Sequence, residues 1–201
     1  MRSMQTLRTA RLVLEPLVVA HARAMFEVLS DPAIYRYLDY PPPASLEHLQ
    51  RVYARLEGRK SADGNELWLN WVVSPFTQPP VGYVQATVYP EQSASVAYVL
   101  SSRHWGRGYA SEAVQAMLEH LASAYGSRRY RATVEAENER SIQLLARLGF
   151  RCATRSEGAR SLSLTERLFV RELTARRRGS RAAADRRAAR RSGRNAPRGR
   201  G

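Results

Sequence analysis

The chain has 201 residues, of which 44% are hydrophobic, a single cysteine and a formal net charge of +14. This size and apolar share suit one globular domain, and a lone cysteine, Cys152, excludes an intrachain disulfide and a thiolate metal cluster. Charges spread through residues 1–17 argue against a signal peptide and no long apolar run marks a membrane span, so we expect a cytoplasmic protein without a metal.

Two helices are predicted near the start of the chain. Residues 11–17 form a short β-rich run, and residues 20–29 follow with apolar side chains at helical spacing. Ser45 is a good N-cap for a second helix that extends to about residue 56. The loop between these helices, residues 33–44, carries three prolines and three tyrosines.

Three strands follow and lead into the longest predicted helix. Apolar residues alternate in residues 67–73, 81–89 and 93–100, and the short turns between them favour antiparallel neighbours. Residues 109–125 are strongly amphipathic, which predicts a helix with one buried face. In the strand predicted over residues 67–73, one face is expected to carry Leu67, Leu69, Trp71 and Val73.

Strand and helix alternate again in the next part of the chain. Residues 130–135 alternate, and Asn138 can cap a short helix over residues 141–148. Residues 151–154 and 167–173 are predicted as the last strands. Four helices are thus predicted in the body of the chain.

The positive charge is concentrated at the end of the chain. Residues 175–201 hold eleven arginines and one acidic residue, so this tail supplies +10 of the net charge. The tail lacks aromatic and large aliphatic side chains and is expected to be disordered, which divides the chain into a domain (1–174) and a tail (175–201). Arginine outnumbers lysine 31 to 1 over the whole chain, which weakens a functional interpretation of any single arginine.

Two glycines mark the junction between strand 93–100 and helix 109–125. Gly106 and Gly108 permit positive φ angles and a close approach to the backbone, and the first turn of a helix offers unpaired N–H groups. Arg103 and Arg107 add positive charge, so the junction predicts a phosphate or pyrophosphate site. The sequence fits neither a P-loop nor a dinucleotide fingerprint, and a tight turn without a ligand remains an alternative.

Four segments together resemble the GCN5-related N-acetyltransferases, in the branch that includes the ribosomal-protein N-terminal acetyltransferases. They are TARLVLEPL, SDPAIYRYLDYPPPASLEHL, RHWGRGYASEA and ENERSIQLLARLGFR, and the resemblance covers about residues 6–174. It implies a mixed α/β fold with a mostly antiparallel central sheet. It also implies that strands 93–100 and 130–135 are a parallel pair that splays apart around acetyl-coenzyme A.

The resemblance further implies which residues hold this donor. The pyrophosphate is expected on the backbone around Gly106 and Gly108, and the pantetheine arm on the strand edge just before it. Asn138 and Ser141 match an Asn-x-x-Ser motif, although Asn138 could equally be a plain helix cap. The full set is Tyr98, Val99, Leu100, Arg103, Gly106, Arg107, Gly108, Tyr109, Ala110, Asn138 and Ser141.

Two residues that often perform the chemistry in relatives are replaced in this chain. Leu145 stands where many relatives have a proton-donating tyrosine, and Ser95 where the branch often has a glutamate base. We therefore expect Ser141 as the proton donor and Glu135 as the base, with Glu91 acting through water as a second candidate. A helix-terminus hydrogen bond for Ser141 and a solvated or ion-paired charge for Glu135 remain alternatives.

The acceptor site is expected to be lined by Tyr35, Tyr37 and Tyr40 of the aromatic loop, with Trp68 or Trp71, although the same aromatic residues could be core filling. The expected acceptor is a protein N-terminal α-amine. The alternatives are a small amine such as a polyamine or an antibiotic, and an adaptor that binds acetyl-coenzyme A with little turnover. The tail favours weak RNA or ribosome contact, and both a monomer and a homodimer are open.

Overall fold

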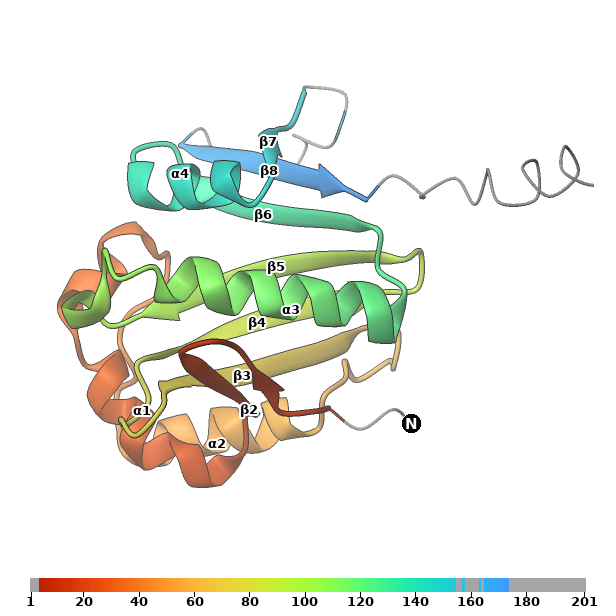
Figure 1. Ribbon diagram of the computed structural model, residues 1–201. Helices are drawn as coiled ribbons and strands as arrows, with labels where there is room; N and C mark the ends of the chain where they lie inside the picture. Colours follow the sequence, from red (N-terminus) through yellow and green to blue (C-terminus); the bar gives the residue numbers. More distant parts are fainter. Residues whose placement is uncertain (1–3, 155–156, 158–162, 164, 174–201) are drawn as a thin grey trace, which may run out of the picture.

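The computed structural model describes residues 4–154, 157, 163 and 165–173, so the predicted tail lies outside the described residues. Eight strands form one sheet in the order β1-β2-β3-β4-β5-β6-β8-β7, with helices on both faces (Figure 1). The strands are β1 (Leu7–Arg8), β2 (Leu12–Pro16), β3 (Leu67–Pro75), β4 (Gly82–Tyr89), β5 (Ser93–Leu100), β6 (Arg129–Glu135), β7 (Arg151–Cys152) and β8 (Glu166–Glu172). The α-helices are α1 (Ala22–Leu29), α2 (Leu46–Glu57), α3 (Tyr109–Tyr125) and α4 (Glu139–Arg147), and the 3₁₀ helices are η1 (Val19–His21), η2 (Pro32–Tyr37) and η3 (Ser102–His104).

Strands β1 to β5 are antiparallel neighbours in chain order, which the short turns predicted for β3, β4 and β5. Because side chains alternate along a strand, each strand sends one set of apolar residues to each face of the sheet. Leu69, Trp71 and Val73 of β3 are buried on the face that α3 covers, whereas Val72 is buried on the other face with α1 and α2. The sheet therefore has an α3-side core and an α1–α2-side core.

The helices match the predicted amphipathic patterns closely. The α3 side chains that are buried include Val114, Met117 and Leu121, which recur at the predicted spacing. Helix α1 begins two residues later than expected because residues 19–21 form a 3₁₀ turn instead. The loop predicted over residues 33–44 overlaps the 3₁₀ helix η2, and the Asp31 carboxylate caps the start of η2 by accepting from Ala33 N.

Strands β5 and β6 form the parallel pair of the sheet, and they separate early. Their pairing covers three positions, from Ser93↔Arg129 to Ser95↔Arg131. Beyond that point β6 stays with β8 up to Glu135↔Glu166, while β5 stays with β4 up to Gly82↔Leu100. The predicted splayed pair is thus confirmed, and the β6-facing edge of β5 beyond Ser95 has no strand beside it in the described sheet.

Candidate active site

The turn between β5 and α3 is shaped to expose backbone N–H groups. Gly106 and Gly108 both have left-handed backbone conformations, with φ of 76° and 78°. The first bond of α3 runs from Glu112 N to Gly108 O, and no described protein group accepts from the N–H groups of residues 106–111. A Cβ atom at Gly106 would meet nothing within 4 Å. These donors, with the positive end of the helix dipole, form a site for an anion.

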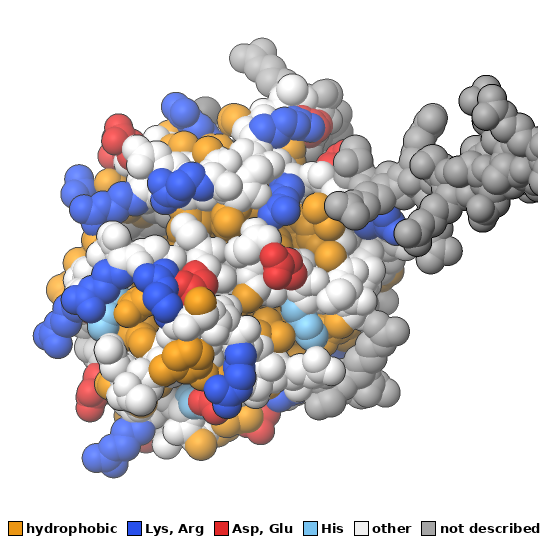
Figure 2. All heavy atoms as spheres, in the orientation of Figure 1, with side chains coloured by type: hydrophobic (Ala, Val, Ile, Leu, Met, Phe, Trp, Pro, Cys, Tyr) orange, Lys and Arg blue, Asp and Glu red, His pale blue; other side chains and the backbone are white. Residues whose placement is uncertain are grey.

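Arginine side chains surround this turn. Figure 2 shows Lys and Arg side chains gathered on the side of this face where α3 begins, and Arg103 and Arg107 are both exposed there. Arg140 of α4 lies over the ring of Trp105 with its guanidinium carbon 4.9 Å from the ring centroid. Trp105 Nε1 donates to Leu100 O at 2.9 Å, so one indole connects the turn, the end of β5 and the start of α4.

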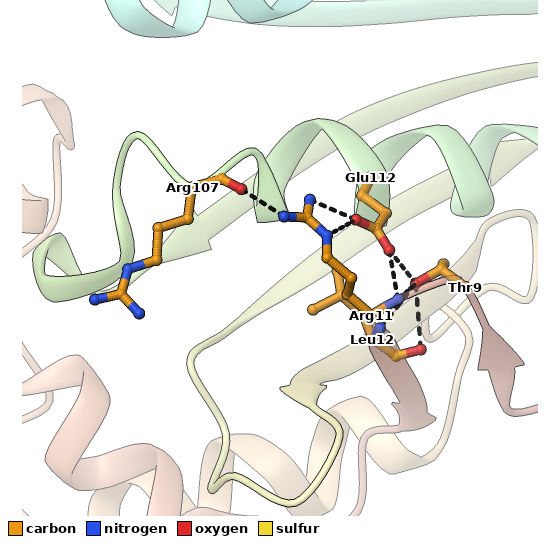
Figure 3. A network of polar contacts seen from close by, with 5 residues as sticks. All are labelled: Thr9, Arg11, Leu12, Arg107 and Glu112. Atoms are coloured by element: carbon orange, nitrogen blue, oxygen red, sulfur yellow. Dashed lines mark hydrogen bonds and ion pairs between the residues drawn. The ribbon is translucent and has the colours of Figure 1, made fainter.

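A polar network that the sequence did not reveal fastens the turn to the N-terminal hairpin (Figure 3). Arg11 Nη1 donates to the carbonyl oxygen of Arg107 at 2.9 Å, and Arg11 Nε donates to Glu112 Oε2 at 2.7 Å. Thr9 and the Arg11 amide both donate to Glu112 Oε1, at 2.6 and 2.9 Å. Burial would raise the pKa of Glu112, but the hydrogen bonds from Thr9 and Arg11 outweigh it and hold that pKa below its usual value.

On the α3 side of the split between β5 and β6, α4 brings two predicted residues together. Asn138 Oδ1 accepts from Ser141 N at 3.2 Å, so the capping role weighed for Asn138 is confirmed. Tyr98 packs against the same core, and burial raises the pKa of its hydroxyl to about 12, against smaller opposing effects of Ser141 and Arg147. The Ser141 side chain thus lies beside Tyr98 Oη, at a geometry outside strict hydrogen-bond limits.

Glu135 lies on the opposite face of the sheet. The pairing Ser95↔Arg131 places alternate residues of β6, including Glu135, on the α1–α2 side, while Val134 packs into the α3-side core. The Glu135 side chain is half-buried, and no ion pair joins it to Arg131 among the described residues. Glu91 precedes β5, so at about 3.3 Å per residue it lies roughly 20 Å or more from Val99 along the strand, which removes it as a candidate base.

Two of the three predicted acceptor tyrosines, Tyr35 and Tyr40, lie near β5 on this second face. Tyr40 and Tyr83 hydroxyls are 3.1 Å apart, and Tyr83 is the β4 partner of Val99. The Tyr35 and Tyr40 rings meet edge to face at 6.0 Å, and Tyr35 Oη donates to Leu29 O at 2.8 Å. Burial, followed by Tyr40 and Asp31, raises the pKa of Tyr35 to about 12. Tyr37 is half-buried beneath the guanidinium of Arg36.

A carboxylate fastens the tyrosine loop to the end of β5. Asp31 Oδ2 accepts from Ser102 N at 2.8 Å, while Oδ1 accepts from Ala33 N at 3.0 Å. Burial would raise the pKa of Asp31, but hydrogen bonds from Ser102, Ala33 and Ser101 together hold it below its ordinary value. The loop that carries these tyrosines and the strand that carries Val99 are therefore held in one arrangement.

The expectation that Trp71 lines the acceptor site is wrong. Trp71 is fully buried in the α3-side core, its Nε1 donates to Gln5 O at 3.0 Å, and its ring packs edge to face on His120. Trp68, the alternative, lies on the α1–α2 side, where it helps to line an open cavity of about 320 Å³ between α2, β3 and β4. Its Nε1 donates to Glu66, and Arg55 lies over its ring at 5.1 Å.

A glycine that the sequence did not single out lets β4 and β5 approach closely. A Cβ atom at Gly82 would lie 2.1 Å from Val99 O and 2.7 Å from Leu100 Cα. Any side chain there would push the β5 backbone out of place. Gly82 is therefore required for the position of the strand edge beside the split.

Other chemically reactive groups lie away from the split. His104 stacks on Tyr109 within the turn, and burial, with Arg107 and Arg103, lowers its pKa. Cys152 is exposed on β7, which β6 and β8 separate from β5. Within the described ranges, no cluster of three or more His, Cys, Asp or Glu side chains could hold a metal ion, and no helix is long and apolar enough to cross a bilayer.

Comparison with known proteins agrees with this geometry. Residues 11–151 match the family described as the acetyltransferase (GNAT) domain. The uncharacterized N-acetyltransferase p20 of Bacillus licheniformis is 29% identical over 149 residues, which cover 73% of this chain and 83% of that protein.

Solved structures with this fold include two ribosomal-protein acetyltransferases. RimL, a ribosomal L7/L12 α-N-protein acetyltransferase in complex with coenzyme A, has a TM-score of 0.70 at 17% identity, covering 84% of this chain and 98% of that chain. Ribosomal-protein-S5-alanine acetyltransferase from Vibrio fischeri has a TM-score of 0.70 at 18% identity, covering 84% and 97%. Such low identities show the fold alone, but the family match extends over most of the described residues. The chain therefore belongs to the GNAT family of acetyl-coenzyme A-dependent N-acetyltransferases.

Proposed function

We propose that this chain acetylates the α-amino group of a protein N-terminus, with acetyl-coenzyme A as the donor. The observation that carries the proposal is the separation of β5 from β6. The opening between these strands lies between the anion-binding start of α3 on one face of the sheet and a tyrosine-lined surface on the other face. Tyr40 on that surface is 45% exposed, and an acceptor side open to solvent suits a large acceptor. The likeness in fold to RimL and to the S5-alanine enzyme supports the same class of acceptor.

The described residues fit the donor. The N–H groups of residues 106–111 lack protein acceptors, Gly106 has open space in front of its Cα, and the edge of β5 is free beyond Ser95. We assign the pyrophosphate to residues 103–110 and the pantetheine arm to the edge that carries Tyr98, Val99 and Leu100, with Asn138 beside it. When bound, acetyl-coenzyme A supplies an activated acetyl group and a thiolate leaving group.

The two residues proposed to transfer protons lie on opposite faces of the sheet. Only the split between β5 and β6 connects these two faces. Glu135 faces the acceptor side, where it takes the proton that the attacking amine loses. Ser141 faces the α3 side, where its hydroxyl lets the departing thiolate gain a proton, directly or through water. Leu145 is fully buried in the core, so the side chain at that position takes no part.

Release of free coenzyme A thiol tests the proposal. The assay compares peptides that begin with free Ala, Ser or Met, matched Nα-acetylated peptides as controls, and two small amines, spermidine and an aminoglycoside. We expect turnover with free peptide N-termini and none with the blocked peptides. Turnover with the small amines alone would assign a small-molecule acceptor instead. Binding of acetyl-coenzyme A without turnover on any acceptor would make the chain an adaptor.

A further inference from the structure

The cavity on the α1–α2 side of the sheet contains a polar side chain without a hydrogen-bond partner. This cavity of about 320 Å³ opens between α2, β3 and β4, and Asn70 of β3 lies in its lining. Asn70 is only 6% exposed, yet no described residue forms a hydrogen bond with its side-chain amide. The amide of Asn65, in the exposed loop before β3, instead donates to Asp63 Oδ2 at 2.8 Å.

A buried amide without partners lowers the stability of a folded protein, because it has lost its hydrogen bonds to water. The Asn70 amide is explained if a bound molecule completes its hydrogen bonding. Gln85 of β4 is paired directly with Asn70, lines the same cavity and is exposed. Each of these amides has an N–H donor and a C=O acceptor. Together they can bind both the C=O and the N–H groups of a polypeptide backbone.

The other walls of the cavity are apolar, and one of them is fixed in place. Val52 and Leu56 of α2 line the cavity together with Trp68 of β3. Trp68 Nε1 donates to Glu66 Oε2 at 2.9 Å, and the guanidinium of Arg55 lies over the indole at 5.1 Å from the ring centroid. A wall that is already ordered can bind an apolar side chain at a small entropic cost.

The opening of the cavity carries a positive charge. Arg55 is exposed there, and no described carboxylate lies within ion-pair distance of its guanidinium. Two acidic residues near it bond elsewhere, since Glu66 accepts from Trp68 and Glu57 Oε2 accepts from Val19 N at 3.1 Å. A ligand with a carboxylate next to its apolar side chain would therefore complement this opening.

The cavity is continuous with the proposed acceptor side. Gln85 pairs with Ala97 of β5, and both side chains are exposed, so the sheet between Val99 and the cavity is open to solvent. The rise along a strand and the spacing between strands put Asn70 roughly 12 Å and Trp68 roughly 17 Å from Val99. An extended polypeptide that begins beside Val99 would reach the cavity at about its fourth to sixth residue, since it advances about 3.3 Å per residue.

We propose that this cavity is a second binding site for the acceptor polypeptide. It holds an apolar side chain from about the fourth to the sixth acceptor residue, and Arg55 binds an acidic residue next to it. Asn70 and Gln85 hydrogen-bond the acceptor backbone. The inference rests on the proposed function and narrows it to N-termini that continue in an extended form with an apolar and acidic pair, which small amines lack.

The test compares peptide amides that share their first three residues. One peptide ends there, and three longer ones of eight residues place leucine at the fourth, fifth or sixth position, each followed by aspartate. In the wild type, kcat/KM of the best long peptide should exceed that of the short one at least about tenfold, mainly through KM. Asn70→Leu removes the amide at similar volume and should reduce this ratio about fivefold or more. Its melting temperature should be unchanged or higher, because an unpartnered amide is removed.

Arg55→Glu and Arg51→Glu are a matched pair on α2, because both exposed arginines change charge equally and Arg51 lies one turn away, outside the cavity lining. Arg55→Glu should favour a long peptide with lysine in place of aspartate, whereas Arg51→Glu should keep the preference for aspartate. The inference alone is overturned by equal kcat/KM for long and short peptides in the wild type, by the same ratio in Asn70→Leu, or by the same preference in both arginine variants. Turnover with no peptide at all would overturn the proposed function and this inference with it.

Discussion

Arg11 donates a hydrogen bond to the backbone carbonyl of Arg107 at 2.9 Å, across 96 residues of sequence. The same guanidinium is held by the Glu112 carboxylate, with Nη2 and Oε2 2.6 Å apart, and its carbon lies 5.0 Å from the centroid of the Tyr109 ring. Arg11 thus holds the anion-binding turn in place through hydrogen bonds and does not itself have to contact the anion. Preorganisation of this kind lowers the entropic cost of binding, because the turn is already ordered.

Replacement of Glu112 tests this preorganisation. Glu112→Gln keeps the side-chain shape but removes the charge that holds Arg11, so we expect a loss of about 1 kcal/mol in unfolding free energy and weaker coenzyme A binding. Urea denaturation and isothermal titration calorimetry measure the two effects. The control is Glu119→Gln, since Glu119 is exposed on the same helix and its side chain accepts a hydrogen bond from Gln115 of that helix. Equal coenzyme A affinity in both variants would show that the network does not support the turn.

The pH dependence of stability tests the Asp31 contact with Ser102. Hydrogen bonds hold the pKa of Asp31 below its unfolded value, so its stabilising contribution is present above the unfolded pKa and is lost as pH falls through the folded pKa. We expect Asp31→Asn to be less stable than the wild type by about 1 kcal/mol at neutral pH. The difference should shrink toward zero in strongly acidic buffer. Denaturant titrations from neutral to acidic pH check this, and a constant difference would show that the charge is not what stabilises the contact.

A methyl group at Gly82 should displace strand β5. The added Cβ in Gly82→Ala would lie 2.1 Å from Val99 O, so the β5 backbone must move, at a cost of about 1–3 kcal/mol in stability. We also expect weaker acetyl-coenzyme A binding, because the moved edge is the proposed pantetheine site. Gly58→Ala is the control, since its Cβ would meet only Arg55 O, at 3.2 Å. Normal acetyl-coenzyme A binding by Gly82→Ala would show that the position of Val99 does not affect the donor site.

The regular elements could be predicted from the sequence because local pattern determines them. Strict alternation identified β3, β4 and β5, and the apolar stripe of α3 ends at Gly126 in the left-handed conformation. Those patterns assign residues to a face but do not say what covers the face. Trp71 was correctly grouped with Leu69 and Val73, yet its assignment to the acceptor site was wrong because α3, and not the acceptor, covers that side.

Contacts between distant segments account for most of what the sequence missed. In the sequence, Glu112 is an ordinary acidic residue in the first turn of a helix. Only the fold brings Thr9 and Arg11 into contact with it. The same is true of Gly82, whose need for close approach depends on the backbone of a neighbouring strand. Likewise, only the fold brings Ser141 and Arg147 of α4 near the Tyr98 hydroxyl.

The arginine-rich tail, which lies outside the described residues, leads to a prediction of its own. With eleven arginines in residues 175–201, we expect weak RNA binding that falls steeply as salt rises, because the arginines release counterions from the phosphates. A chain that ends at Thr174 should lose this binding and keep its acetyltransferase activity. Fluorescence anisotropy with a labelled RNA at several salt concentrations measures it. Equal RNA affinity in the full and shortened chains would assign the contact to the domain.

The central claim, that the turn before α3 binds the pyrophosphate of acetyl-coenzyme A, is tested most directly at Gly106. Gly108 is less suitable because a side chain there would meet Arg11 Nη2 at 3.3 Å, whereas a Cβ atom at Gly106 meets nothing within 4 Å. Gly106→Asp and Gly106→Asn impose similar backbone strain, since both residues tolerate the left-handed conformation, and they differ in charge. Calorimetric titration with acetyl-coenzyme A should show that the Asp variant binds at least about tenfold more weakly than the Asn variant. Equal affinity of the two variants would contradict the assignment.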